Sequence, residues 1–163
     1  MKNVRQKTNR NGFTLIEVIA VMAIVTVILG AVLAAVQGAM NNGKVASTLS
    51  TIKALQTASV NFYNANGGTY ANSGSLGVGL SLANLAAQNM LPNNVINGTN
   101  AWNGTITIAP DTNPLYFDLT LTNVPVNAGG TGTPPGTLTA AVANLIQATP
   151  TYTAKTSTWT AVF

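Results

Sequence analysis

The sequence predicts an α+β protein in which a long N-terminal α-helix packs on a small head with an antiparallel β-sheet. Residues 13–36 are almost entirely apolar, and residues 44–63 continue with an amphipathic helical pattern. Residues 64–163 contain short stretches that alternate with the period of a β-strand. We therefore expect a basic leader at residues 1–12, one long helix at residues 13–63 and a globular α+β head at residues 64–163.

The apolar stretch is long enough to cross a membrane. Residues 13–36 exceed the roughly 20 residues that a helix needs to span a bilayer. Basic residues precede the stretch and favour a cytoplasmic N-terminus, with the rest of the chain outside: Lys2, Arg5, Lys7 and Arg10. A plain signal anchor and a cleavable secretory signal are the alternatives, but a secretory signal has an apolar core of only about 7–15 residues.

The side-chain inventory argues against an enzyme. The chain has no Cys and no His, and its acidic residues are Glu17, Asp111 and Asp118. Without imidazole or thiolate groups we expect no catalytic residues, no cofactor and no metal site. The basic residues are concentrated in the leader, so the charge of the head does not indicate nucleic acid as a partner.

The second half of the long helix is expected to present one apolar face. Its members are spaced by threes, fours and a seven: Val45, Leu49, Ile52, Ser59 and Tyr63. The run from Asn64 to Gly68 (NANGG) is expected to end the helix, because Gly and Asn tolerate the left-handed conformation that closes helices.

Short elements are predicted in the head. Ser81 is expected to cap a helix over residues 82–90. Residues 105–109 and 115–122 alternate as two strands of a hairpin, joined by a turn at residues 110–114.

The C-terminal part is predicted to contain a loop, a helix and a strand. Residues 125–136 are rich in Gly and Pro and predict a loop. Thr137 is expected to cap a helix that carries Leu138, Val142, Leu145 and Ile146. Residues 151–163 alternate as one Thr-rich strand.

One carboxylate, Glu17, interrupts the apolar segment. A charge at mid-bilayer costs about 2.5–3.5 kcal/mol, but the cost is smaller near the end of a helix. A carboxylate in the first turn also gains from the helix dipole. The residues alone leave two interpretations open: an interfacial Glu without a partner, or a carboxylate kept for a function.

The stretch from Gly12 to Val18 (GFTLIEV), between a basic leader and an unbroken apolar helix, resembles the start of type IV pilins and pseudopilins. The resemblance covers about the first third of the chain. It implies cleavage between Gly12 and Phe13 by a membrane-embedded prepilin peptidase, followed by N-methylation of Phe13. It also implies assembly through the apolar helix, in which Glu17 pairs with the Phe13 amine of a neighbouring copy.

The chain departs from the family pattern at two features. Many family members have a proline where this chain has Ala34, and Gly30, Gly38 and Gly43 are expected to supply helix flexibility instead, at about 1 kcal/mol each relative to Ala. A C-terminal disulfide, common in pilins, is impossible without Cys. Phe13 and the short leader resemble the type IVa branch, whereas residues 100–108 resemble a stretch of some type IVb members, so the branch stays open.

The resemblance implies a structural subunit that forms a homo-oligomeric helical filament. Its expected partners are the prepilin peptidase, the pilus assembly machinery and the inner membrane before assembly, and the assembled pilus is expected at the cell surface. A pseudopilin of a type II secretion system, or a single-pass anchored adhesin or DNA-uptake module, are the alternatives.

Two further patterns are weaker. Asn97 and Asn103 each begin an Asn-Gly-Thr sequence that matches the glycosylation pattern, but Asn-Gly is first a turn signal. Asp111 and Asp118 are too few carboxylates for a calcium site, which takes about 6–8 oxygen ligands.

Overall fold

The computed structural model describes residues 13–163 except residues 94, 131–135, 147–148 and 154–157. Contacts divide the chain into two units, Met1–Met40 and Asn41–Phe163, and helix α1 (Leu15–Ala65) contributes to both. The α+β class with a long N-terminal helix is confirmed. The helix begins and ends two residues later than the sequence predicts.

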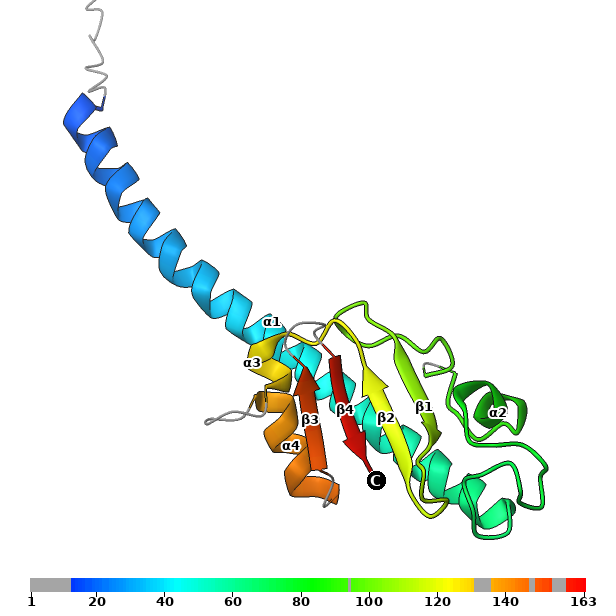
Figure 1. Cartoon of the computed structure of the whole chain (residues 1–163). Coiled ribbons are helices and arrows are strands. Elements are labelled where there is room, and N and C mark those ends of the chain that lie inside the picture. The colour runs from blue at the N-terminus through cyan, green and yellow to red at the C-terminus, as the bar shows by residue number, and fades with distance from the viewer. Residues whose placement is uncertain (1–12, 94, 131–135, 147–148, 154–157) are drawn as a thin grey trace, which may run out of the picture. The chain divides into compact units, whose positions relative to one another are not determined.

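The second unit contains a four-stranded antiparallel sheet in the order β1-β2-β4-β3. Figure 1 shows the C-terminal part of α1 crossing one face of this sheet, with α2 on the β1 side and α4 beside β3. After α1 the elements are α2 (Leu82–Ala87), β1 (Ile106–Pro110), β2 (Phe117–Leu121), α3 (Val126–Gly129), α4 (Thr137–Ile146), β3 (Thr149–Thr153) and β4 (Thr158–Val162).

The core of the second unit lies between α1 and the sheet. The predicted face of α1 is correct at Val45, Ile52 and Ser59, which are buried, whereas Leu49 and Tyr63 are only partly buried beside the core. A helix that packs on a sheet buries a wider stripe of side chains than the five residues named from the sequence. The prediction therefore missed four further buried residues. These are Thr48, Leu55, Ala58 and Phe62. The sheet meets them with Ile106, Ile108, Phe117, Leu119, Leu121 and Ala161.

Glycines close α1 as the sequence predicts. The backbone N–H of Gly68 donates to the carbonyl oxygen of Tyr63 over 2.9 Å. Gly67 and Gly68 have φ angles of 75° and 82°, in the left-handed region that only glycine adopts without strain.

The loop after α1 is organised by the side chain of Asn66, which is fully buried. Its amide nitrogen donates to the carbonyl oxygens of Thr69 (2.9 Å) and Ala71 (2.8 Å). Its side-chain oxygen accepts from the backbone N–H of Leu76 over 2.9 Å. One buried amide therefore connects three points of the loop. The sequence prediction treated Asn66 only as a helix terminator.

Helix α2 is shorter than predicted. Ser81 caps it as expected, because its hydroxyl oxygen accepts from the N–H of Asn84 over 3.2 Å. The helix ends at Ala87. Two residues later, Asn89 takes a φ of 56°, in the left-handed region, and turns the chain away from the helix axis. The predicted extension to Met90 is therefore wrong.

Two predictions between the hairpin and the C-terminus also need correction. The predicted loop at residues 125–136 contains the four-residue helix α3, which follows Pro125. Thr137 is the first residue of α4 rather than its cap, because the N–H of Ala140 donates to the carbonyl of Gly136 over 2.9 Å. Leu138 and Val142 are buried in the core, and the side chains of Leu145 and Ile146 lie outside the described residues.

The prediction of one strand over residues 151–163 is wrong, because β3 and β4 pair as two antiparallel strands. A change of parity in the sequence marks the break. Thr151 and Thr153 stand at odd positions, whereas Thr158 and Thr160 stand at even positions. A single strand would place these pairs on opposite faces, while two paired strands place all four on one face.

The face of the sheet opposite the core carries a threonine row across all four strands. Thr107 pairs with Thr120, Thr120 with Thr160, and Thr160 with Thr151. The hydroxyl oxygens of Thr120 and Thr160 are 3.2 Å apart and share a hydrogen bond. These cross-strand contacts stabilise the sheet with β-branched, uncharged side chains.

Candidate processing and assembly site

Helix α1 begins with a reciprocal capping arrangement between Thr14 and Glu17. The Oε2 atom of Glu17 accepts from the backbone N–H and from the hydroxyl of Thr14, each over 2.8 Å. The Thr14 hydroxyl oxygen accepts from the N–H of Glu17 over 3.4 Å, and the carbonyl of Thr14 accepts the N–H of Val18 over 3.2 Å. Thr14 is therefore the N-cap of the helix, and Glu17 is the third helical residue of a capping box.

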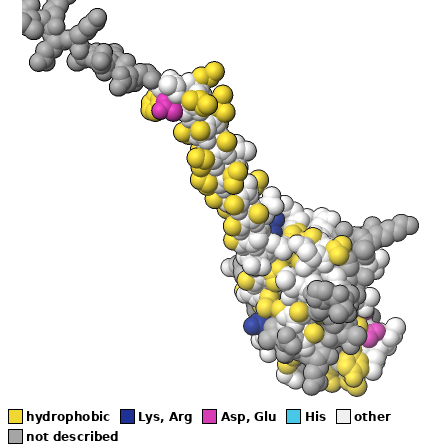
Figure 2. All heavy atoms as spheres, turned by 90° about the vertical axis from the view of Figure 1, so that its left-hand side faces the viewer, with side chains coloured by type: hydrophobic (Ala, Val, Ile, Leu, Met, Phe, Trp, Pro, Cys, Tyr) yellow, Lys and Arg dark blue, Asp and Glu magenta, His cyan; other side chains and the backbone are white. Residues whose placement is uncertain are grey.

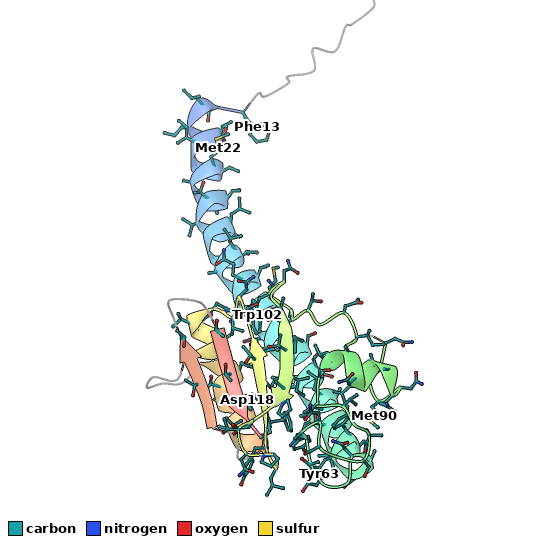
Figure 3. All side chains as sticks on the ribbon, turned by 45° about the vertical axis from the view of Figure 1, so that its right-hand side comes forward. Phe13, Met22, Tyr63, Met90, Trp102 and Asp118 are labelled. Carbon is teal, nitrogen blue, oxygen red and sulfur yellow. The ribbon has the colours of Figure 1, made fainter. Side chains whose placement is uncertain are left out.

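Phe13 lies immediately outside this helix start. Its side chain is 88% exposed, and it borders a shallow hollow of about 290 Å³ together with Glu17, Val18, Val21 and Met22. Figure 3 shows Phe13 and Met22 near each other at this end of α1. Gly12, the other residue of the predicted cleavage junction, lies outside the described residues.

The described part of the first unit, residues 13–40, is nearly all helix and has no tertiary cover from other described residues. Residues 13–40 are all exposed, and the most apolar window of α1 has a mean hydropathy of 2.9. Figure 2 shows hydrophobic side chains along this part of the helix, with an acidic group near its start. This part of α1 is long and apolar enough to cross a membrane. A signal sequence meets the same two criteria of length and composition. A helix that is apolar all round needs lipid or other helices around it.

The comparisons with known proteins identify this same segment. Residues 7–33 match the family described as the prokaryotic N-terminal methylation motif. This match supports a type IV pilin-like prepilin. No curated protein and no solved structure matches the chain. The matched residues contain the predicted junction, the capping box and most of the apolar stretch at residues 13–36.

The glycines in the N-terminal part of α1 lie on its open surface. Gly30, Gly38 and Gly43 are inside α1, and a Cβ atom added to any of them would have no neighbouring atom within 4 Å. No packing contact among the described residues therefore requires glycine at these positions. The helix runs through all three without a break, so their role in flexibility stays a prediction.

Glu17 has no basic neighbour within the apolar part of α1. The sequence has no Lys or Arg between Phe13 and Lys44. In the described residues the Glu17 carboxylate bonds to neutral donors of Thr14. The sequence analysis missed this role of Thr14, although the pattern Thr-x-x-Glu before an apolar run is the signature of a capping box.

The carboxylates of the second unit do not form a metal site in the described residues, where no group of three potential ligands was found. Asp111 bonds to the backbone N–H and hydroxyl of Thr112 at the hairpin turn. Asp118 lies in β2 between Ala109 and Val162 of the adjacent strands. Burial, and secondarily the charge of Asp111, raise the pKa of Asp118 above its ordinary value.

The two Asn-Gly-Thr patterns occupy tight turns. Asn103 is exposed with a φ of 59°, and Gly98 has a φ of 60°. The side chain of Asn100 holds this loop, because its oxygen accepts from the N–H groups of Trp102 (2.9 Å) and Gly104 (3.0 Å). Turn formation therefore accounts for Asn-Gly at these positions.

Proposed function

We propose that this chain is a pilin, the structural subunit of a type IV pilus-like surface filament. The match of residues 7–33 to the methylation motif carries the proposal. The precursor is stored in the inner membrane through α1, with residues 64–163 outside the cytoplasm. After assembly the subunit lies in a filament at the cell surface.

Processing is the first step of this function. A class III signal of this kind implies a prepilin peptidase and the pilus assembly machinery as partners. We propose that the peptidase cleaves between Gly12 and Phe13 and that the new Phe13 amine is methylated. Replacing Gly12 with Leu is expected to leave only full-length protein in the membrane, as measured by mass analysis of the N-terminus. A normal filament yield from Gly12→Leu contradicts this cleavage site.

Polymerisation follows from the exposure of the apolar helix. The side chains of residues 13–40 are exposed among the residues that the structure describes. Lipid covers such a surface before assembly, and the same helices of other copies replace the lipid in a filament. The filament is therefore a homo-oligomer with the apolar part of α1 at its centre.

Glu17 gives the sharpest test of polymerisation. Buried among apolar helices, an unpaired carboxylate is costly, and the Phe13 amine freed by cleavage of a neighbouring copy is the cation at the same depth. Glu17→Ala is expected to leave the precursor inserted and cleaved while the yield of sheared filaments falls sharply. Thr26→Ala, at another exposed polar position of the same helix, is the matched control. Filaments of unchanged number and length from Glu17→Ala refute the assembly role.

The motif match also fits a pseudopilin of a type II secretion system. Long filaments on cells favour the pilin, whereas their absence together with a secretion defect favours the pseudopilin. An intact N-terminus in sheared surface material favours an anchored adhesin or DNA-uptake module instead.

Flexibility of the helix belongs to the same proposal. Gly30, Gly38 and Gly43 lower helix propensity by about 1 kcal/mol each relative to Ala. We propose that α1 loosens between Gly30 and Gly43 when the filament forms or is stretched. A density map of the filament that shows regular helix from Leu15 to Ala65 contradicts this proposal.

A further inference from the structure

We propose that Thr14 is a positioning residue that presents the Glu17 carboxylate to the cation of a neighbouring subunit. This inference rests on the proposed function. Its basis is the double contact at one carboxylate oxygen, where the N–H and the hydroxyl of Thr14 both donate to Oε2 over 2.8 Å. The hydrogen bonds among the described residues leave Oε1 without a donor. One oxygen is therefore fixed to its own helix, and the other is open to a partner.

The chemistry of the two donors matters for pairing. An amide N–H and a hydroxyl are neutral, so they orient the carboxylate without cancelling its charge. A cation that approaches Oε1 meets a full negative charge whose direction is already set. A flexible Glu side chain loses rotamer freedom when it pairs, and here the capping box has removed much of that freedom before assembly.

Phe13 borders the same hollow as Glu17, with its side chain 88% exposed. It stands one position before the N-cap, where an apolar residue packs against the fourth helical residue in a hydrophobic staple. That fourth residue is Val18, and Phe13 and Val18 border the same hollow as Glu17. The capping box marks where α1 begins and holds the Oε2 atom of the carboxylate against Thr14.

The test compares four variants of the full chain, expressed in cells that carry the peptidase and the assembly machinery. Thr14→Val is isosteric and removes the hydroxyl, and Thr14→Ser restores it. Thr26→Val is the matched control, because the Thr26 hydroxyl also bonds within the helix, to the carbonyl of Met22 over 2.8 Å. Glu17→Gln keeps an oxygen acceptor for Thr14 but removes the charge. The cleaved fraction and the yield of sheared filaments are measured for each.

We expect Thr14→Val to be cleaved normally and to lower filament yield about fivefold, the factor that corresponds to a typical lost helix cap. Thr14→Ser and Thr26→Val are expected to match the wild type, and Glu17→Gln to give few filaments despite an intact helix start. The positioning role is overturned if Thr14→Val and Thr26→Val give equal yields, if Thr14→Ser fails to rescue, or if the Thr14→Val defect is a loss of cleavage.

The failure of the broader proposal has a different signature. If the wild-type chain forms no filaments, or if Glu17→Gln polymerises normally, then the assembly role of Glu17 itself is wrong. A different result rejects the positioning role alone. In that case the wild type forms filaments, Glu17→Gln does not, and Thr14→Val gives the same filament yield as the wild type.

Discussion

Replacing Asn66 with Ala is expected to destabilise the second unit by about 3 kcal/mol. The side chain is fully buried and makes three hydrogen bonds, two as donor to Thr69 and Ala71 and one as acceptor from Leu76. Each intramolecular hydrogen bond contributes roughly 1 kcal/mol net, and a buried partner left unsatisfied costs about 1–3 kcal/mol. Because Thr69, Ala71 and Leu76 are only partly buried, water replaces some of the lost bonds, and the lower end of that range applies.

The assay is thermal unfolding of the full chain in detergent micelles, followed by tryptophan fluorescence, since Trp102 belongs to the second unit. A loss of about 3 kcal/mol corresponds to a midpoint lower by roughly 10 °C. Asn64→Ala is the matched control, because Asn64 is exposed two residues away. Asn66→Asp keeps the acceptor and loses both donors, so its midpoint is expected between the two. Equal midpoints for Asn66→Ala and Asn64→Ala refute the argument.

Three more substitutions test the second unit. Gly104→Ala is expected to cost about 3 kcal/mol in urea unfolding, because its Cβ would lie 1.9 Å from the carbonyl oxygen of Thr122. Phe163→Ala is expected to cost about 2 kcal/mol, because its ring stacks on Phe117 with centroids 5.1 Å apart; an unchanged midpoint contradicts this. Burial raises the pKa of Asp118 in the folded state. The contribution of Asp118 to the free energy of unfolding is therefore most favourable below its pKa in the unfolded chain, and it is lost as pH rises through its pKa in the folded state. Asp118→Asn is therefore expected to be slightly stabilising at pH 7 and to lose that advantage in acid, and a pH-independent difference contradicts the assigned cause.

The sequence predicted the elements whose signals are local and strong. The long helix follows from an unbroken apolar run and an amphipathic continuation, and its end follows from Gly67 and Gly68. The hairpin of β1 and β2 follows from alternation on both sides of a turn rich in Pro and Asn. Ser81 was recognisable as a cap because the hydroxyl precedes a short apolar helix.

The features that the sequence did not predict depend on contacts between distant residues, or on changes in the alternation of side chains along the strands. The burial of Asn66 and Asn100 is set by the loops that close around them, and Asn in a polar stretch predicts exposure. The division of the C-terminal stretch into β3 and β4 was visible as a parity shift between Thr153 and Thr158. The Thr14 contact was visible in the sequence as the capping-box pattern Thr-x-x-Glu before an apolar run, which gives Glu17 a role within its own helix.

The threonine row has a consequence for how this surface meets other molecules. Among the residues of the four strands, Asp118 is the one ionisable group that is charged at neutral pH. Hydroxyl groups carry no net charge, so Asp118, which shares a face with Thr120, is the single charge that the four strands offer for steering a partner, and the association rate is expected near the unsteered value of about 10⁵–10⁶ M⁻¹s⁻¹. Recognition there depends on contact geometry at short range and is almost independent of ionic strength.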